Sequence, residues 1–149
     1  MRGIQYAHRG QSAPHGNHPK VGSNFFANYN FIVQDDGGVT IGDNFMAGPN
    51  VTLSTPLHPL SGRQRAGMVN EKGETFIPCY AKPITIGNDV WLCAGVVVCA
   101  GVTIGDGAVI GAGSVVTHDI PAGVLAYGVP CRVIREITKE DEKAMEALI

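Results

Sequence analysis

Residues 86–134 read IGNDVW-LCAGVV-VCAGVT-IGDGAV-IGAGSV-VTHDIP-AGVLAY-GVPCRV-I, and an aliphatic or small residue returns at every sixth position. A second series of this kind stands two residues earlier and begins at Ile84. Residues two apart in an extended chain point to the same side, so each pair predicts a short strand with one buried face. Gly or Asp follows at a fixed offset, at Asp89, Gly95, Gly101, Gly107, Gly113 and Asp119. These residue types adopt the positive φ of a sharp corner, and strand and corner at period six predict a parallel β-helix.

The same period occurs earlier in the chain, at Val21, Ala27 and Val33 and then at Ile41, Ala47 and Leu53. The slip between the two runs contains Asp35-Asp36-Gly37-Gly38, which predicts a bulge or an extended corner. Three hexads would close one triangular coil, so we expect an all-β domain over residues 21–136. The period stops over residues 54–83, where we expect an excursion loop, and long loops inside compact repeats are usually functional.

The two ends of the chain do not follow the hexad pattern. Residues 1–20 contain His8, His15 and His18 and predict an irregular N-terminal segment, either poorly ordered or docked on a partner. Residues 137–149 predict a short C-terminal helix that packs over the last coil and covers its exposed strand edge.

The bulk composition indicates one domain of 149 residues with a net charge of −2. That balance favours neither nucleic acid nor an anionic membrane as a partner. The sequence shows no signal-peptide pattern and no apolar run long enough to span a bilayer, so the expectation is a soluble cytoplasmic protein. The four cysteines lack CxxC spacing, which favours packed thiols, with a disulfide or a metal role as the alternative.

His58 is the main candidate for chemistry. It lies in Leu53-Ser54-Thr55-Pro56-Leu57-His58-Pro59, where the excursion leaves the repeat. The flanking prolines restrict the backbone and would hold the side chain in place. An imidazole, which titrates near neutral pH, is a suitable general base for a hydroxyl group. An ordinary surface histidine is the alternative.

Five other residues fit either ligand binding or a structural role. Asn28 and Asp36 lie on early coils that stacking could bring near residue 58, and each either orients an imidazole, binds a sugar hydroxyl or shapes a corner. Trp91 is either a stacking surface for a ligand or a packed outer face. Arg132 and Arg135, near the end of the repeat, either bind phosphates or form a solvated rim.

Several motifs together are more specific than the repeat. They are Gly22-Ser23-Asn24-Phe25-Phe26-Ala27-Asn28, Ile41-Gly42-Asp43-Asn44, Asn50-Val51-Thr52-Leu53-Ser54, His58-Pro59, Lys82-Pro83-Ile84-Thr85-Ile86-Gly87-Asn88-Asp89-Val90-Trp91, Gly111-Ala112-Gly113-Ser114 and Gly128-Val129-Pro130-Cys131-Arg132. With these motifs, residues 21–136 resemble the maltose and galactoside O-acetyltransferase family of hexapeptide-repeat acyltransferases. The resemblance implies a left-handed β-helix, a homotrimer and acetyl-CoA as donor. The handedness comes only from the resemblance, since general topology rules favour the right hand.

The resemblance also implies roles for individual positions. His58 resembles the catalytic base of the family, with Asn28 and Asp36 in the acceptor pocket. The positions that match the acetyl-CoA site are Trp91 in the donor region, Ala94 and Ala112 along the pantetheine arm, and Thr117, His118, Arg132 and Arg135 near the nucleotide.

The sequence departs from the family pattern in three places. The helical segment that usually precedes the first coil is missing, and residues 1–20 stand in its place. His118 stands where the family often has Lys, which weakens a phosphate contact unless the imidazole is protonated. The excursion between His58 and Pro83 is longer than in better-known members, like an added flap.

The sequence thus predicts acetyl transfer from acetyl-CoA to a sugar-like hydroxyl, with His58 as general base and no metal. In a homotrimer the cleft would lie between subunits, where the flap of one subunit covers the next. The oxyanion needs donors, either backbone N–H groups or a serine side chain. One alternative is a truncated, non-catalytic β-helix protein. Another is a γ-type carbonic anhydrase, which needs three histidines on one metal.

Overall fold

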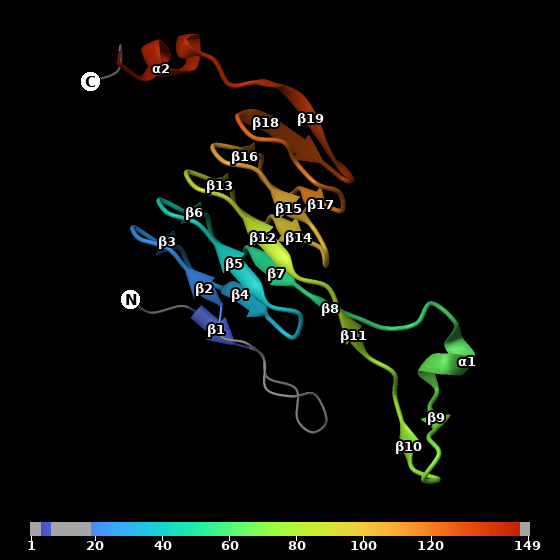
Figure 1. The fold of residues 1–149 in the computed structure, drawn as a ribbon. Helices are drawn as coiled ribbons and strands as arrows, with labels where there is room; N and C mark the ends of the chain where they lie inside the picture. Colours follow the sequence, from blue (N-terminus) through green and yellow to red (C-terminus); the bar gives the residue numbers. More distant parts are fainter. Residues whose placement is uncertain (1–3, 7–18, 147–149) are drawn as a thin grey trace.

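A computed structural model describes residues 4–6 and 19–146, which form a three-sided prism of short strands (Figure 1). The chain visits three sheets in turn, and parallel pairing joins each coil to the next. This arrangement confirms the parallel β-helix predicted by the six-residue period.

The three sheets are made of strands that lie far apart in the sequence. In spatial order, the first sheet contains β1 (Ile4–Tyr6), β4 (Phe31–Gln34), β7 (Thr52–Ser54), β14 (Val97–Val98) and β17 (Val115–Val116). The second contains β15 (Thr103–Ile104), β12 (Ile84–Ile86), β5 (Val39–Ile41) and β2 (Lys20–Val21). The third contains β19 (Cys131–Glu136), β18 (Val124–Gly128), β16 (Val109–Ile110), β13 (Trp91–Leu92), β6 (Met46–Ala47) and β3 (Phe26–Ala27).

The interior of the prism is filled by the inward residues of the hexads. Ile41, Ile86 and Ile104 stack in register on three successive coils, and all three are buried. Stacked corner residues are 20 positions apart in the early coils and 18 apart later. The extra residues of the early coil form the expected turn, in which Gly38 N–H donates to the Asp35 carbonyl at 2.7 Å.

The hexad interpretation is wrong for the end of the repeat. Ala122 is exposed and Ile134 is 46% exposed, although both fall in the series that begins at Ile86. The last coil is shorter, because Ile104 pairs with Ile120 only 16 residues later. After it, Val124 and Ala126 supply the buried side chains instead.

Two kinds of corner residue carry positive φ. Asn24, Asn44 and Asp89 occupy one corner at φ values of 56°, 55° and 57°, and glycine takes the equivalent position in later coils. The side chains form a ladder, in which Asn24 Nδ2 donates to Asn44 Oδ1 and Asn44 Nδ2 donates to Asp89 Oδ1, each at 2.8 Å. Asp119 differs from the expectation, since it is not among the positive-φ residues. Its carboxylate accepts the Thr103 N–H at 2.7 Å.

Both ends of the chain add strands to the prism. β1 pairs in parallel with β4, so residues 4–6 are not irregular as expected for residues 1–20. Residues 1–3 and 7–18, which include His8, His15 and His18, lie outside the described residues, as do 147–149. At the other end β19 folds back antiparallel on β18, and α2 (Lys139–Glu146) follows it (Figure 1). The expected helix therefore exists, but β19 rather than the helix covers the edge of the third sheet.

The expected excursion loop is an ordered arm with its own secondary structure. It leaves the prism after β7 and returns at β12 (Figure 1). Its elements are β8 (Pro56–Leu57), α1 (Gly62–Arg65), β9 (Met68–Val69), β10 (Thr75–Phe76) and β11 (Tyr80–Ala81). β8 pairs antiparallel with β11, and β9 pairs antiparallel with β10. We call residues 55–83 the arm. No helix in the described part of the chain has the length and apolar character needed to cross a membrane.

Candidate active site

His58 lies on the arm, directly after β8. The β8–β11 ladder pairs Leu57 with Tyr80, which brings the two strands of the arm together beside the histidine. His58 Nδ1 is 2.8 Å from the Pro78 carbonyl oxygen. A carbonyl only accepts hydrogen bonds, so Nδ1 carries the proton of the neutral imidazole and Nε2 keeps its lone pair. The half-buried ring is therefore held with Nε2 ready to accept a proton.

A buried hydroxyl fixes the root of the arm. Thr55 is completely buried, and its Oγ1 donates to the Gln34 carbonyl at 2.6 Å and accepts the Gly37 N–H at 2.9 Å. The returning strand is tied to the same residue, because Lys82 N–H donates to the Thr55 carbonyl at 3.1 Å. Sequence reasoning did not select Thr55; the one available signal was a polar residue in an inward position where the repeat breaks.

Asn28 and Asp36 lie at two different corners of the prism. Asn28 follows β3, and its Oδ1 accepts the Tyr29 N–H at 2.7 Å, which is corner chemistry. Asp36 is exposed and follows β4, beside the arm root, where a Cβ on Gly37 would stand 2.8 Å from the Lys82 carbonyl carbon. Among the described residues no hydrogen bond or ion pair joins Asn28, Asp36 and His58.

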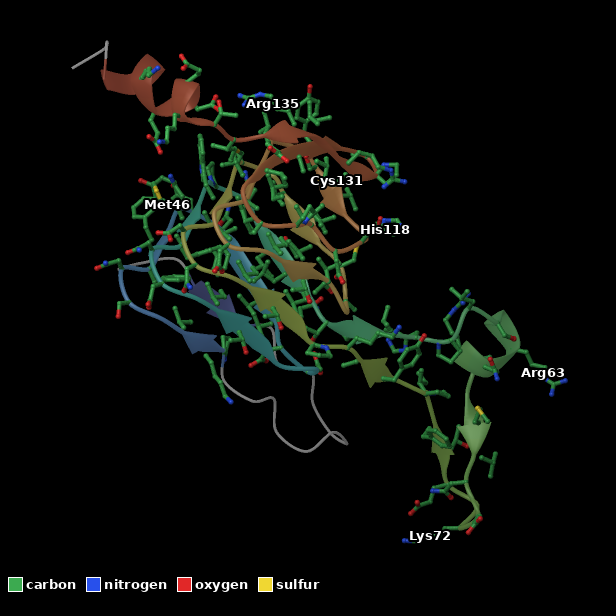
Figure 2. The ribbon with its side chains drawn as sticks, turned by 45° about the horizontal axis from the view of Figure 1, so that its top comes forward. Met46, Arg63, Lys72, His118, Cys131 and Arg135 are labelled. Carbon is green, nitrogen blue, oxygen red and sulfur yellow. The ribbon has the colours of Figure 1, made fainter. Side chains whose placement is uncertain are left out.

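Trp91 lies on the outer face of the third sheet, between Met46 and Val109. Phe26, Met46 and Trp91 form an exposed apolar column there, with exposed fractions of 53%, 50% and 48%. Met46 lies on the side of the prism away from the arm (Figure 2). One chain therefore keeps the Trp91 column and the arm histidine on opposite sides.

Ala94 and Ala112 stack at the corner between the third and first sheets. Gly113 N–H, next to Ala112, donates to the Ala94 carbonyl at 2.9 Å, and both alanines are exposed. Gly95 and Gly113 follow them with φ values of 72° and 70°. The absence of large side chains at these positions leaves the backbone of this corner open to a ligand.

The positions expected near the nucleotide differ in their surroundings. A hydrogen bond of 2.8 Å joins Thr117 Oγ1 and His118 Nδ1, and both residues are exposed. His118 lies on the side of the prism from which the arm projects (Figure 2). Arg132 is exposed and donates to the Cys131 carbonyl at 2.9 Å.

Arg135 is bound to the start of α2. Its two terminal nitrogens donate to the two Asp141 carboxylate oxygens at 2.8 and 2.7 Å. These hydrogen bonds, together with one from the Thr138 N–H, hold the pKa of Asp141 well below its usual range. Arg135 thus anchors the C-terminal helix in this structure, while Arg132 and His118 form no ion pair within the described part of the chain.

The described residues contain no cluster of three histidine, cysteine, aspartate or glutamate side chains suited to a metal ion. The donor set that a γ-type carbonic anhydrase requires is therefore absent from this part of the chain.

Comparisons with known proteins identify the relatives of this architecture. Residues 83–118 match the family model for the bacterial transferase hexapeptide (six repeats). Over 128 residues the chain is 52% identical to the galactoside O-acetyltransferase of Escherichia coli (strain K12), covering 86% of this chain and 59% of that protein. The chain is thus similar to members of the maltose and galactoside O-acetyltransferase family, and residues 83–118 carry the hexapeptide repeat.

Two solved structures of family members share the fold. A galactoside acetyltransferase in complex with coenzyme A aligns with a TM-score of 0.73 at 52% identity, covering 83% of this chain and 57% of that one. A maltose O-acetyltransferase from Clostridium difficile 630 aligns with a TM-score of 0.72 at 47% identity, covering 80% of this chain and 59% of that one. The prism is thus the left-handed parallel β-helix of the hexapeptide-repeat acyltransferases. The chain spans less than two thirds of the length of these relatives.

Proposed function

We propose that the protein transfers the acetyl group of acetyl-CoA to a hydroxyl group of a sugar or sugar-like acceptor. The observation that carries the proposal is the hydrogen bond from His58 Nδ1 to the Pro78 carbonyl, which leaves Nε2 as a proton acceptor. The relatives support the choice of reaction, since one is named a galactoside O-acetyltransferase and one solved structure holds coenzyme A.

In the proposed reaction His58 Nε2 takes the proton of the acceptor hydroxyl as its oxygen attacks the thioester carbon. A new C–O bond forms, the C–S bond breaks, and the imidazolium returns the proton to the leaving thiolate. General-base help of this kind contributes about 10²–10⁴ in rate. Asn28 and Asp36 are proposed to bind acceptor hydroxyls, as amide and carboxylate groups do readily.

The donor is proposed to lie along the exposed corner at Ala94 and Ala112, with Trp91 nearby. Small side chains there permit close approach to the backbone, whose N–H and C=O groups would bind the pantetheine amides. Thr117, His118, Arg132 and Arg135 are the candidates for the nucleotide end. Of the two arginines, Arg132 is the better phosphate ligand, because Arg135 already binds a carboxylate.

We further propose a homotrimer whose active sites lie between subunits. The support is the separation of the arm from the Trp91 column within one chain (Figure 2). The arm also exposes apolar side chains, including Ile77 at 62% and Leu60 at 96%. Packing the arm of one subunit against the next would bury the apolar side chains of the arm and the Trp91 column. It would also bring His58 toward the donor track, by which we mean the exposed corner at Ala94 and Ala112. A cytoplasmic location, where acetyl-CoA is available and thiols stay reduced, fits the four free cysteines.

The reaction is tested by following thiol release from acetyl-CoA with a panel of glycosides. We expect turnover with at least one acceptor and a loss of about 10²-fold or more in His58→Ala, with binding of CoA unchanged. Lys72→Ala is the control, because it removes an exposed side chain at the far end of the arm (Figure 2). Bound CoA without turnover on any acceptor would favour the non-catalytic alternative.

Subunit mixing tests the location of the site. His58→Ala lacks the base, and Ala112→Phe blocks the donor track, so each variant alone should be inactive. After subunit exchange, an inter-subunit site should recover about one quarter of wild-type activity, since one site in four combines an intact base with an intact track. A site built within one chain would recover none.

A further inference from the structure

Arg65 ties down the backbone that directly follows the proposed base. Its Nη1 donates to the Pro59 carbonyl at 2.8 Å and to the Leu60 carbonyl at 2.7 Å. Arg65 is the last residue of α1, so its side chain reaches back over the helix to the turn that leads into it. We propose that Arg65 is a positioning residue for His58, an inference that rests on the proposed function.

Little else holds this turn. The β8–β11 ladder ends at Leu57, and proline at position 59 has no N–H to donate. Within its own chain Leu60 is 96% exposed, so no packing inside the subunit fixes it. In the described residues the side-chain bonds to these two carbonyls come from Arg65 alone. A guanidinium donating to two successive carbonyls fixes their relative orientation, which an ordinary loop leaves free.

The arm therefore holds His58 from two sides. The Pro78 carbonyl oxygen accepts the hydrogen bond from His58 Nδ1–H, and Arg65 fixes the peptide groups that follow the His58 Cα. If the turn is released, the imidazole moves relative to Pro78, and the Nδ1–H form loses its advantage over the Nε2–H form. The population with a free Nε2 then falls, and the base is misplaced for part of the time.

Arg63 provides a matched control on the same helix. It is exposed, it points away from the arm (Figure 2), and within the described chain its side chain forms no hydrogen bond or ion pair. Arg63→Met and Arg65→Met remove the same charge two residues apart. Only Arg65→Met releases the turn, so effects of net charge or helix composition cancel between the two variants.

The first measurement does not depend on activity. In full-length protein labelled with ¹⁵N-histidine, we expect the His58 ring to show a protonated Nδ1 at neutral pH. Arg63→Met should leave the signal unchanged, Arg65→Met should shift it toward a mixture of tautomers, and Arg65→Lys should restore it in part. An Arg65→Met spectrum identical to that of Arg63→Met would overturn the proposal, and far-UV circular dichroism checks that each variant is folded.

The second measurement uses the acetyl-transfer assay. We expect Arg65→Met to lower kcat about 10-fold with the KM for acetyl-CoA unchanged, and Arg65→Lys to recover much of the loss. A wild-type kcat in Arg65→Met would overturn the positioning role. If the wild type itself turns over no acceptor, the proposed function fails, whereas the tautomer measurement still decides the role of Arg65.

Discussion

The asparagine ladder permits a quantitative test of what stabilises the coils. Asn44 contributes in two ways, through its hydrogen bonds to Asn24 and Asp89 and through its tolerance of a φ of 55°. Asn44→Gly keeps the conformational freedom and removes the two bonds, each with a net contribution of about 0.5–1.5 kcal/mol. We therefore expect the free energy of unfolding to fall by about 1–3 kcal/mol. Asn44→Ala removes the bonds and adds the strain of alanine at positive φ, about 1–2 kcal/mol more.

A glycine elsewhere in the prism measures the strain by itself. Gly113 has a φ of 70°, and a Cβ added there meets nothing within 4 Å. Gly113→Ala should therefore cost only the strain of about 1–2 kcal/mol. If the two contributions are independent, the loss in Asn44→Ala equals the sum of the losses in Asn44→Gly and Gly113→Ala.

The assay is urea denaturation at one fixed protein concentration, because assembly makes stability depend on concentration. Trp91 fluorescence and far-UV circular dichroism should give coincident transitions. A wild-type stability in Asn44→Gly would show that the side-chain bonds of the ladder contribute nothing. Equal stabilities of Asn44→Gly and Asn44→Ala would show that positive φ carries no cost at this corner.

Three other predictions follow from the site and its surroundings. Thr55→Val should lower the free energy of unfolding by about 1–3 kcal/mol and reduce the proposed acetyl transfer, because the buried arm root loses its hydroxyl; an unchanged urea midpoint would contradict this. Pairing with Arg135 depresses the pKa of Asp141, so the ionised Asp141 stabilises the fold fully above the ordinary carboxyl pKa of 3.8, and this stabilisation is lost as the pH falls through the lower pKa of the folded state. Amide hydrogen exchange in α2 should therefore become faster in that acidic range in the wild type, whereas in Asp141→Asn it should not respond to that pH change. Maleimide should modify the exposed Cys79 first and Cys131 only after unfolding, because burial shields the Cys131 thiol and raises its pKa; early labelling of Cys131 in a mass-spectrometric time course would refute this.

The sequence predicts the inside of the prism well because period and burial have the same cause. An aliphatic pair every six residues can face inward only if the coils stack, so Leu92 and Ile104 are identified without knowledge of their partners. The same reasoning fails at Ala122 and Ile134, where small or aliphatic residues continue the pattern after the chain has left it. Composition alone does not mark the shorter last coil.

The site is less predictable because its geometry depends on pairing across the arm. The contact between His58 and Pro78 joins residues 20 positions apart and exists because β8 pairs with β11. Arg65 and Thr55 act on the histidine through backbone atoms, for which the sequence carries no periodic signal. The separation of Trp91 from the arm is likewise a property of the coil order rather than of any local motif.

The arm is inserted between two coils, and it does not interrupt the parallel pairing of their strands. Thr52 pairs with Val97 and Val39 with Ile84 in unbroken parallel register on either side of the insertion. Lengthening such an insertion is inexpensive, since each doubling of a loop costs only about 0.6 kcal/mol in closure entropy. The scaffold and the segment that bears the proposed base can therefore evolve separately. Arms could be exchanged between relatives while the prism, which carries Asn28 and Asp36, is kept constant.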